Sequence, residues 1–409
     1  LASGLSTRCH LLSGPDTMIA FSRWFFPAFL IMVGSVDAGS IFSFNGQGYP
    51  LRRQDSRATG MGGAGRALVD GNNLSSFNPA LLGSFRRPAM FGQFSMQRRS
   101  VTDPSNSFAI ADGDVSALKV VFPFRFRGTL SIGVEGITDV DLTVVDTLGT
   151  GGEEHLLGLK GTGGVGAVVI GFGQKFGSRL FLGAQADLMI MGTITETWSK
   201  DLFNDADAFF SLDTVTRSQK GAQFSVGGVF TLGNLSLALT FKPKATVTQR
   251  LLLENRLTTN AIADAAVETE RDLRFPTTVA FGMAYAKTRR WIFALDGEYA
   301  VWADTEPGRH NTFEVAAGVQ FQTRPGNSLG IGRRYDLMGG VYRRSLYFRT
   351  PSADPVVELG ISAGIAVPFQ NNSGAFRWTL EFGRRGDVQS HGAKETFIKQ
   401  TFSIAGLVM

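Results

Sequence analysis

Apolar and polar residues alternate along much of this chain with a period of two. The clearest run is 234–242, where Leu235, Leu237, Leu239 and Phe241 occupy one face and small or polar residues occupy the other. The same alternation recurs over 311–322 and 374–385. Because successive side chains of a β-strand point to opposite faces, this pattern predicts strands with one continuous apolar face.

Fourteen such segments follow one another from Ala89 onward. Several are separated by tight glycine-containing turns and others by long polar stretches such as 200–215 and 255–265, which is the pattern of transmembrane β-barrels. The expected strands are 89–99, 115–124, 127–146, 152–173, 179–199, 216–232, 234–254, 266–286, 289–303, 311–322, 329–345, 355–368, 374–385 and 394–408. We therefore predict an all-β chain, a transmembrane antiparallel barrel of about 14 strands over residues 89–409. A soluble β-sandwich is the alternative, but its second face should be charged, whereas here that face is mostly Gly, Ala, Ser and Thr.

The first part of the chain does not follow the strand pattern. Residues 1–17 precede Met18, which we take as the start of translation, and residues 18–38 combine Arg23, an apolar core over 24–36 and small residues before Gly39. This three-part pattern predicts a secretory signal peptide and hence export. Residues 39–88 are rich in glycine and too long for a structureless connection, so we expect them to pack as a hatch or plug inside the barrel.

Composition agrees with an exported barrel. Only 18% of the 409 residues are charged, while 50 are glycine and 34 are phenylalanine. The net charge of +5 is spread without blocks of like charge, which argues against nucleic acid as a partner. The single cysteine, Cys9, precedes the expected start, so disulfides are not available to the exported chain.

Motifs for catalysis or cofactor binding lack their structural context. Ser362 lies in a Gly-x-Ser-x-Gly pattern but falls within a strand, where a nucleophile elbow would need a sharp turn into a helix. The histidines His155, His310 and His391 are isolated and lack the spacing of metal ligands. We therefore expect no enzyme activity, no catalytic residues, no metal and no cofactor.

Charged residues on the predicted inner face are candidate interior groups. We expect them to pair across strands or to contact the hatch, with a polar end of a ligand path as the alternative. They are Asp296, Glu298, Arg377, Glu381 and Arg385.

One segment resembles a known family. The run Ser56 to Leu68, with its Gly60 to Gly65 glycine-alanine stretch, and the later Phe77-Asn-Pro-Ala80 are similar to the N-terminal part of the FadL/TodX family of outer-membrane transporters of hydrophobic compounds. The resemblance implies a 14-stranded barrel, a lumenal hatch and a kinked third strand that opens sideways into the bilayer. It assigns the hatch residues Gly62, Gly63, Gly65, Asn78, Pro79 and Ala80, and the candidate kink residues Gly133 and Gly136.

Two functions follow as expectations. The resemblance implies a monomeric channel in the bacterial outer membrane, in contact with its lipid, for passive, hatch-gated uptake of hydrophobic molecules such as long-chain fatty acids or hydrocarbons, with lateral release. The same segment also resembles PorV-type barrels, which implies a role in protein secretion or surface attachment. A third possibility, a barrel hydrolase, would depend on Ser362.

Overall fold

A computed structural model describes residues 40–43, 47–71, 73–104, 107–124, 128–150, 153–202, 210–257, 265–288, 290–323, 334–348, 354–369 and 374–407. The regions expected to hold the upstream residues and the signal peptide, 1–17 and 18–38, lie outside these ranges. Among the described residues, no helix has the length and apolar character needed to cross a membrane.

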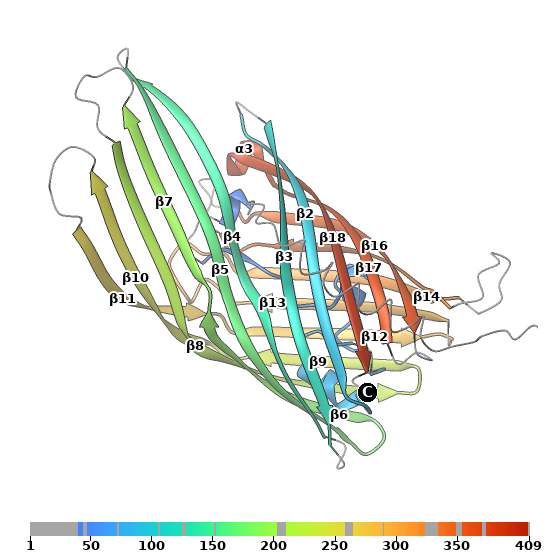
Figure 1. Cartoon of the computed structure of the whole chain (residues 1–409). Helices are drawn as coiled ribbons and strands as arrows, with labels where there is room; N and C mark the ends of the chain where they lie inside the picture. The colour runs from blue at the N-terminus through green and yellow to red at the C-terminus, as the bar shows by residue number, and fades with distance from the viewer. Residues whose placement is uncertain are drawn as a thin grey trace, which may run out of the picture. The chain divides into compact units, whose positions relative to one another are not determined.

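Strands make up nearly all of the described chain from residue 89 onward (Figure 1). Before them lie η1 (Ile41–Ser43), β1 (Tyr49–Pro50), α2 (Ser56–Gly60) and η2 (Pro79–Ser84). The later elements are β2 (Ala89–Thr102), β3 (Ser107–Pro123), β4 (Gly128–Thr150), β5 (Glu153–Phe176), β6 (Leu180–Met191), β7 (Thr193–Leu202), β8 (Phe210–Leu232), β9 (Leu235–Lys242), β10 (Ala245–Leu257), β11 (Ala265–Phe275), β12 (Thr278–Ala286), β13 (Trp291–Ala300), β14 (Thr312–Gln322), β15 (Asp336–Ser345), β16 (Val357–Phe369), β17 (Gly374–Asp387), α3 (Val388–His391) and β18 (Ala393–Leu407).

These elements form a closed antiparallel barrel of 14 wall strands within the described chain. Three wall strands are interrupted, so that β6 with β7, β9 with β10, and β11 with β12 each count as one. The last strand, β18, pairs with the first, β2, and so closes the sheet (Figure 1). All 14 predicted strands are present, which confirms the fold class.

Three short breaks subdivide predicted strands that the sequence pattern shows as continuous. Gly192, with φ +83°, separates β6 from β7, and Pro276 lies in the break between β11 and β12. Proline cannot donate a hydrogen bond to a neighbouring strand, and a positive φ turns the backbone out of the extended conformation. The pattern of apolar residues runs across these breaks, so periodicity alone does not reveal them.

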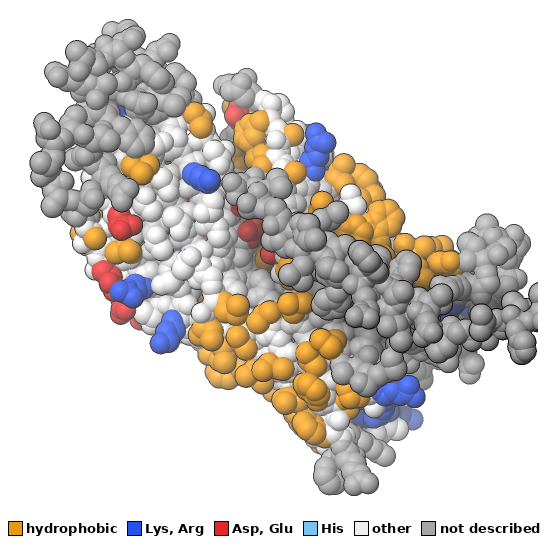
Figure 2. Space-filling model, in the orientation of Figure 1, with side chains coloured by type: hydrophobic (Ala, Val, Ile, Leu, Met, Phe, Trp, Pro, Cys, Tyr) orange, Lys and Arg blue, Asp and Glu red, His pale blue; other side chains and the backbone are white. Residues whose placement is uncertain are grey.

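The two faces of the wall have opposite character. Phe376, Trp378 and Phe382 of β17 are exposed, while Arg377 and Glu381 between them are buried. Large apolar side chains gather on the outer face of the wall (Figure 2). An apolar exterior around a polar interior is the arrangement of a barrel surrounded by lipid, so the fold is typical of the bacterial outer membrane.

The wall strands differ greatly in length. β4 has 23 residues and β14 has 11. At about 3.3 Å per residue and a tilt of about 40°, these lengths correspond to heights of roughly 58 Å and 28 Å, against an apolar band of about 25 Å. One side of the barrel, made of the far parts of β4, β5 and β8 together with β7, β10 and β11, therefore extends well beyond the bilayer (Figure 1). We call this part the extended sheet.

Candidate functional site

The N-terminal segment, residues 40–43, 47–71 and 73–88, lies against the inner face of the wall. Residues 56–60 of α2 are all buried, as are Ala80 and Leu81 of η2. Met61 and Ala64 form one apolar cluster with Leu81, Phe181 of β6 and Val229 of β8. The interior of the barrel is thus occupied by its own chain.

Local sequence explains the shape of this segment. The Asp55 carboxylate accepts a hydrogen bond from the Ala58 amide at 3.0 Å and so caps the first turn of α2. Asn78 caps η2 in the same way, through a bond from the Ala80 amide at 3.1 Å, and Pro79 occupies the first position of η2. Both elements are short, and their ends are fixed by side chains of the segment itself.

The glycine-rich stretch lies close to the wall. The Gly62 amide donates to Ser362 Oγ at 2.8 Å, and Ser362 Oγ donates to the Gly60 carbonyl at 3.1 Å. Gly62 and Gly63 have φ values of +73° and +100°, and a Cβ at Gly62 would lie 2.6 Å from the backbone of Val341. Ser362 therefore binds the backbone of the N-terminal segment.

Four arginines of the segment reach carboxylates or amides of the wall. Arg53 bonds Glu135 of β4 at 2.9 Å and Asp187 of β6 at 3.0 Å. Arg52 bonds Glu314 of β14 at 2.7 Å. Burial opposes the charge of Arg53, but Asp187 and Glu135 outweigh that effect and raise its pKa above the usual value.

The other two arginines extend this network. Arg57 donates to Gln320 of β14 at 2.7 Å, and Arg66 pairs with Glu298 of β13. Asp296 of β13 accepts from the amides of Gly65 and Arg66, both at 2.9 Å. Two of the predicted interior charges, Asp296 and Glu298, are thus brought together by the N-terminal segment.

Two of the remaining predicted interior charges, Glu381 and Arg385, belong to a second network. Arg385 of β17 lies 3.0 Å from Glu358 of β16 and 3.4 Å from Glu395 of β18. Glu381 accepts a bond of 2.6 Å from the Tyr342 hydroxyl. Arg377 is buried but lies apart, beside a cavity that also contains Arg57 and Asp70.

The wall carries glycines where η2 approaches it, a feature that sequence reasoning missed. A Cβ at Gly173 of β5 would lie 2.7 Å from the Gly83 amide nitrogen, and one at Gly183 of β6 would lie 2.6 Å from the Ala80 nitrogen. A Cβ at Gly227 of β8 would lie 3.1 Å from Pro79 Cδ. Glycines in the middle of neighbouring strands mark such close approaches, and this was the available signal.

The candidate kink residues lie on β4. A Cβ at Gly136 would meet Leu51 at 2.7 Å, and one at Gly133 would meet β3. The register between β4 and β5 shifts between Gly136 and Thr138. That these glycines open a route for cargo stays a prediction.

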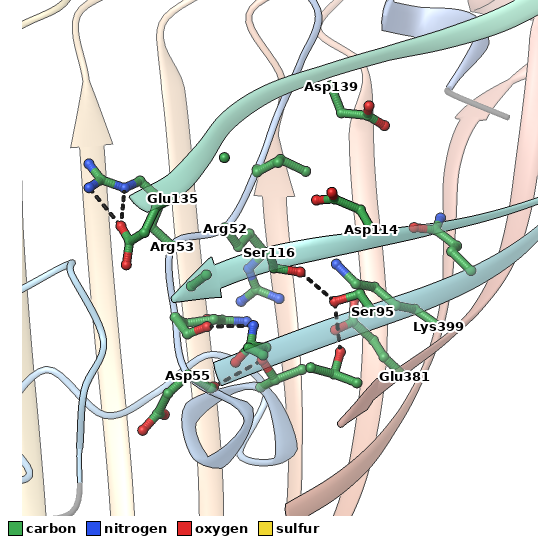
Figure 3. A pocket seen from close by; sticks show the side chains of 18 of the residues that line it. Arg52, Arg53, Asp55, Ser95, Asp114, Ser116, Glu135, Asp139, Glu381 and Lys399 are labelled. Atoms are coloured by element: carbon green, nitrogen blue, oxygen red, sulfur yellow. Dashed lines mark hydrogen bonds and ion pairs between the residues drawn. The ribbon is translucent and has the colours of Figure 1, made fainter. Parts of the chain in front are cut away.

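Two small cavities lie between the N-terminal segment and the wall. One cavity of about 80 Å³ is lined by charged residues that include Arg52, Arg53, Asp114, Glu135 and Asp139 (Figure 3). A second, of about 200 Å³, borders Lys242, Glu298 and Glu314 as well as Phe275 and Trp302. Pockets for small organic ligands typically occupy about 300–1,000 Å³ with mostly apolar walls. No group of three or more His, Cys, Asp or Glu in the described ranges is arranged to hold a metal ion.

This architecture defines a class: outer-membrane β-barrels with the fold of the FadL/TodX channels. The Ralstonia pickettii toluene transporter TbuX is similar with a TM-score of 0.57 and 11% identity, over 90% of this chain and 100% of TbuX. A Pseudomonas aeruginosa FadL homologue gives 0.58 and 11% over 88% and 98%, and the Pseudomonas putida toluene transporter TodX gives 0.55 and 13% over 88% and 98%. At this identity the likeness shows the fold alone.

A family model also matches the chain. The BamG family model matches residues 21–405, and the chain belongs to the BamG family. No curated protein matches the sequence.

Proposed function

We propose that this protein serves protein secretion or surface attachment, with its interior kept closed by the N-terminal segment acting as a hatch. One observation carries the proposal: the space where a hydrophobic solute would pass is occupied by a segment joined to the wall through Arg52, Arg53, Arg57 and Arg66. A hydrophobic solute could pass only by displacing these groups, and that displacement would leave buried charges without partners.

The extended sheet supports the same proposal. It offers a folded surface beyond the bilayer, built of regular strands that can hold binding residues in fixed positions. A channel for small solutes does not need a wall of this height, whereas a protein that engages exported polypeptides does need a surface outside the membrane. The protein would then act through its exterior.

A second candidate is passive uptake of hydrophobic molecules. Its support is the shared fold with proteins described as toluene transporters and a monoaromatic hydrocarbon channel. In that case the N-terminal segment would move to open a path, and Gly133 and Gly136 would lie at the lateral exit.

Deletion of the gene separates the two candidates. In the deletion strain, we expect quantitative proteomics of peptides released by protease from the cell surface to show loss of specific surface proteins. Uptake of labelled toluene and oleate should be unchanged. A variant in which Asn-Gly replaces both 194–217 and 246–274 removes most of β7, β10 and β11 and the first part of β8, and it keeps the pairs Thr193–Ser218 and Ala245–Phe275. It should fail to restore the surface proteins. Heat modifiability on gels verifies that its barrel folds. An intact surface proteome together with lost uptake would establish the second candidate.

A further inference from the structure

Four basic residues lie near one another on the outer face of the wall. The three arginines among them are exposed and the lysine is half-buried. Along their strands they alternate with inward-facing residues, such as the buried Arg385 and Arg99. The four residues are Arg343 of β15, Arg384 of β17, Lys394 of β18 and Arg98 of β2, and we call them the basic patch.

The strand register places three of these cations around one hydroxyl. Arg384 lies opposite Thr396 of β18, and Thr396 lies opposite Ser100 of β2. Lys394 precedes Thr396 by two positions, and Arg98 lies opposite the residue that follows Thr396 by two positions. With strands about 4.8 Å apart and about 3.3 Å per residue, each of the three cations has its Cα within about 9 Å of the Thr396 Cα. Thr396 and Ser100 are themselves exposed.

The fourth cation extends the patch across two further strands. Arg343 and Arg384 both lie opposite Leu359 of β16, one on each side of it. Two strand spacings, about 10 Å, therefore separate the Cα atoms of these arginines. The strands β2, β18, β17 and β16 lie side by side in this part of the wall (Figure 1).

Within the described strands β15 to β18, β2 and β3, the outer face carries no carboxylate. Asp387, beside the patch, has inner-face parity, and its carboxylate caps α3 by accepting from the amides of Gln389 and Ser390. The other acidic residues of these strands also occupy inner-face positions, and they are Asp112, Asp114, Asp336, Glu358, Glu381 and Glu395. The basic patch therefore presents positive charge without acidic neighbours on its own face.

The basic patch lies where the apolar outer face ends. Each arginine follows an exposed apolar residue by two positions: Val341 before Arg343, Phe382 before Arg384, and Met96 before Arg98. β2 starts at the end of the wall where the short links 177–179 and 233–234 lie, and runs away from it. Short links mark the periplasmic end of such barrels, so the basic patch lies at the level of the outer-leaflet head groups.

Phosphate is the anion that suits this set of donors. A guanidinium binds phosphate through two parallel N–H groups, and a lysine ammonium or a hydroxyl adds a further donor. A phosphate monoester carries about 1.5–2 negative charges near pH 7, so a head group with two monoesters balances the four cations of the patch. A single phosphodiester would leave most of that positive charge unbalanced. Acyl chains below such a head group would contact the exposed Phe382 and Met96.

We propose that the basic patch binds a diphosphorylated glycolipid of the outer leaflet. The head-group phosphates contact the four cations together with Thr396 and Ser100, and the acyl chains lie along the apolar face below them. Bound there, the lipid holds the shorter strands of the wall at the membrane surface, while the extended sheet, built from other strands, projects beyond it. This inference does not depend on the proposed function.

Native mass spectrometry of the full chain in detergent micelles tests the choice of lipid. The probes are diphosphoryl lipid A, monophosphoryl lipid A and phosphatidylglycerol, titrated separately. We expect diphosphoryl lipid A to bind about tenfold more tightly than either of the others, because each cation near an anionic head group contributes about a factor of five in affinity. Equal binding of phosphatidylglycerol would show that the wall attracts any anionic lipid and would overturn the proposal.

Variants locate the site. A patch variant replaces three cations by glutamine: Arg98→Gln, Arg384→Gln and Lys394→Gln. Its affinity for diphosphoryl lipid A should fall by about two orders of magnitude.

A matched control removes the same charge from exposed positions near the periplasmic end of the wall: Arg87→Gln, Arg179→Gln and Lys287→Gln. This variant should bind diphosphoryl lipid A as the parent does. Heat modifiability on gels verifies that both barrels fold. Unchanged binding by the patch variant, or an equal loss in both variants, would refute the basic patch as the lipid site.

Discussion

Removal of the Arg53 side chain tests whether ion pairs hold the N-terminal segment in the barrel. In Arg53→Ala, Glu135 keeps two other partners, the ammonium of Lys119 and the hydroxyl of Ser76 at 2.7 Å. Asp187, which is 1% exposed, keeps the hydrogen bond of 2.8 Å from the Gln185 side-chain amide. The substitution therefore leaves one buried carboxylate with a neutral donor in place of a guanidinium.

The expected cost follows from that difference. Breaking a buried ion pair by removing one partner costs about 3–5 kcal/mol. We expect the lower end, about 3 kcal/mol, because Glu135 stays paired and Arg53 is not fully enclosed, with 10% of its side chain exposed. At 1.36 kcal/mol per factor of ten, this corresponds to a roughly 150-fold larger population in which the segment has left the wall.

Thiol labelling measures that population. Ser75 is buried in the N-terminal segment, so Ser75→Cys in a Cys9→Ser background reports its release. The rate of reaction with a bulky maleimide in nanodiscs should rise by about two orders of magnitude on adding Arg53→Ala, provided closing is faster than labelling. The barrel itself should stay folded, since its backbone bonds close without the segment.

A second substitution provides the control. Asp187→Asn removes the charge that Arg53→Ala leaves unpaired, so the double variant should label several times more slowly than Arg53→Ala alone. In the presence of Arg53, the same Asp187→Asn change should accelerate labelling. If Arg53→Ala leaves the rate unchanged, or if Asp187→Asn brings no relief, the ion pair does not hold the segment and the reasoning fails.

Three further outcomes are expected. Leu239 of β9 is 59% exposed on the outer face. Leu239→Arg should therefore lower the free energy of unfolding of the barrel by about 2–4 kcal/mol, measured by urea unfolding from liposomes, while Leu239→Phe should not. Equal effects of the two substitutions would mean that this face does not contact lipid. Gly183→Leu places a side chain against Pro79 and Ala80 and should release the segment in the labelling assay. Gly297→Ala in β13, whose added methyl would lie 4.0 Å from the Glu314 carbonyl oxygen, should behave as the parent. An unchanged labelling rate in Gly183→Leu would refute close packing of η2. Deletion of 44–76 should leave a folded barrel whose planar-bilayer conductance rises to open-pore levels, and unchanged conductance would show that another part of the chain closes the pore.

The strands could be predicted because lipid imposes a strict period on them. At Leu235 to Phe241 every second residue must be apolar, and that constraint is local, so it is visible in a single sequence. The interruptions at Gly192 and Pro276 are harder to predict from the sequence, since the alternation of apolar and polar residues continues across them. Only the identity of the residue, a glycine or a proline, indicates the break.

The interior could be predicted only in part. The sequence identified Asp296 and Glu298 as inner-face residues because that depends on strand parity alone. It could not show that Arg66 joins them, or that Arg53 reaches both Glu135 and Asp187, because these contacts join residues separated by 82 to 232 positions. Such pairings depend on how the N-terminal segment is placed within the closed barrel, and no local pattern encodes that placement.

The short link between η2 and the wall limits the order in which the barrel assembles. η2 ends at Ser84 and β2 begins at Ala89, and β2 is also the strand that must meet β18 to close the sheet. η2 also fits against glycines of β5, β6 and β8, so it can dock as soon as those strands have paired. Closure joins strands more than 300 residues apart in some pairs, such as Ala89 with Leu407, and brings the steepest loss of chain entropy. The N-terminal segment would therefore bind to an open, incomplete sheet. The later pairing of β18 with β2 would close the barrel around it.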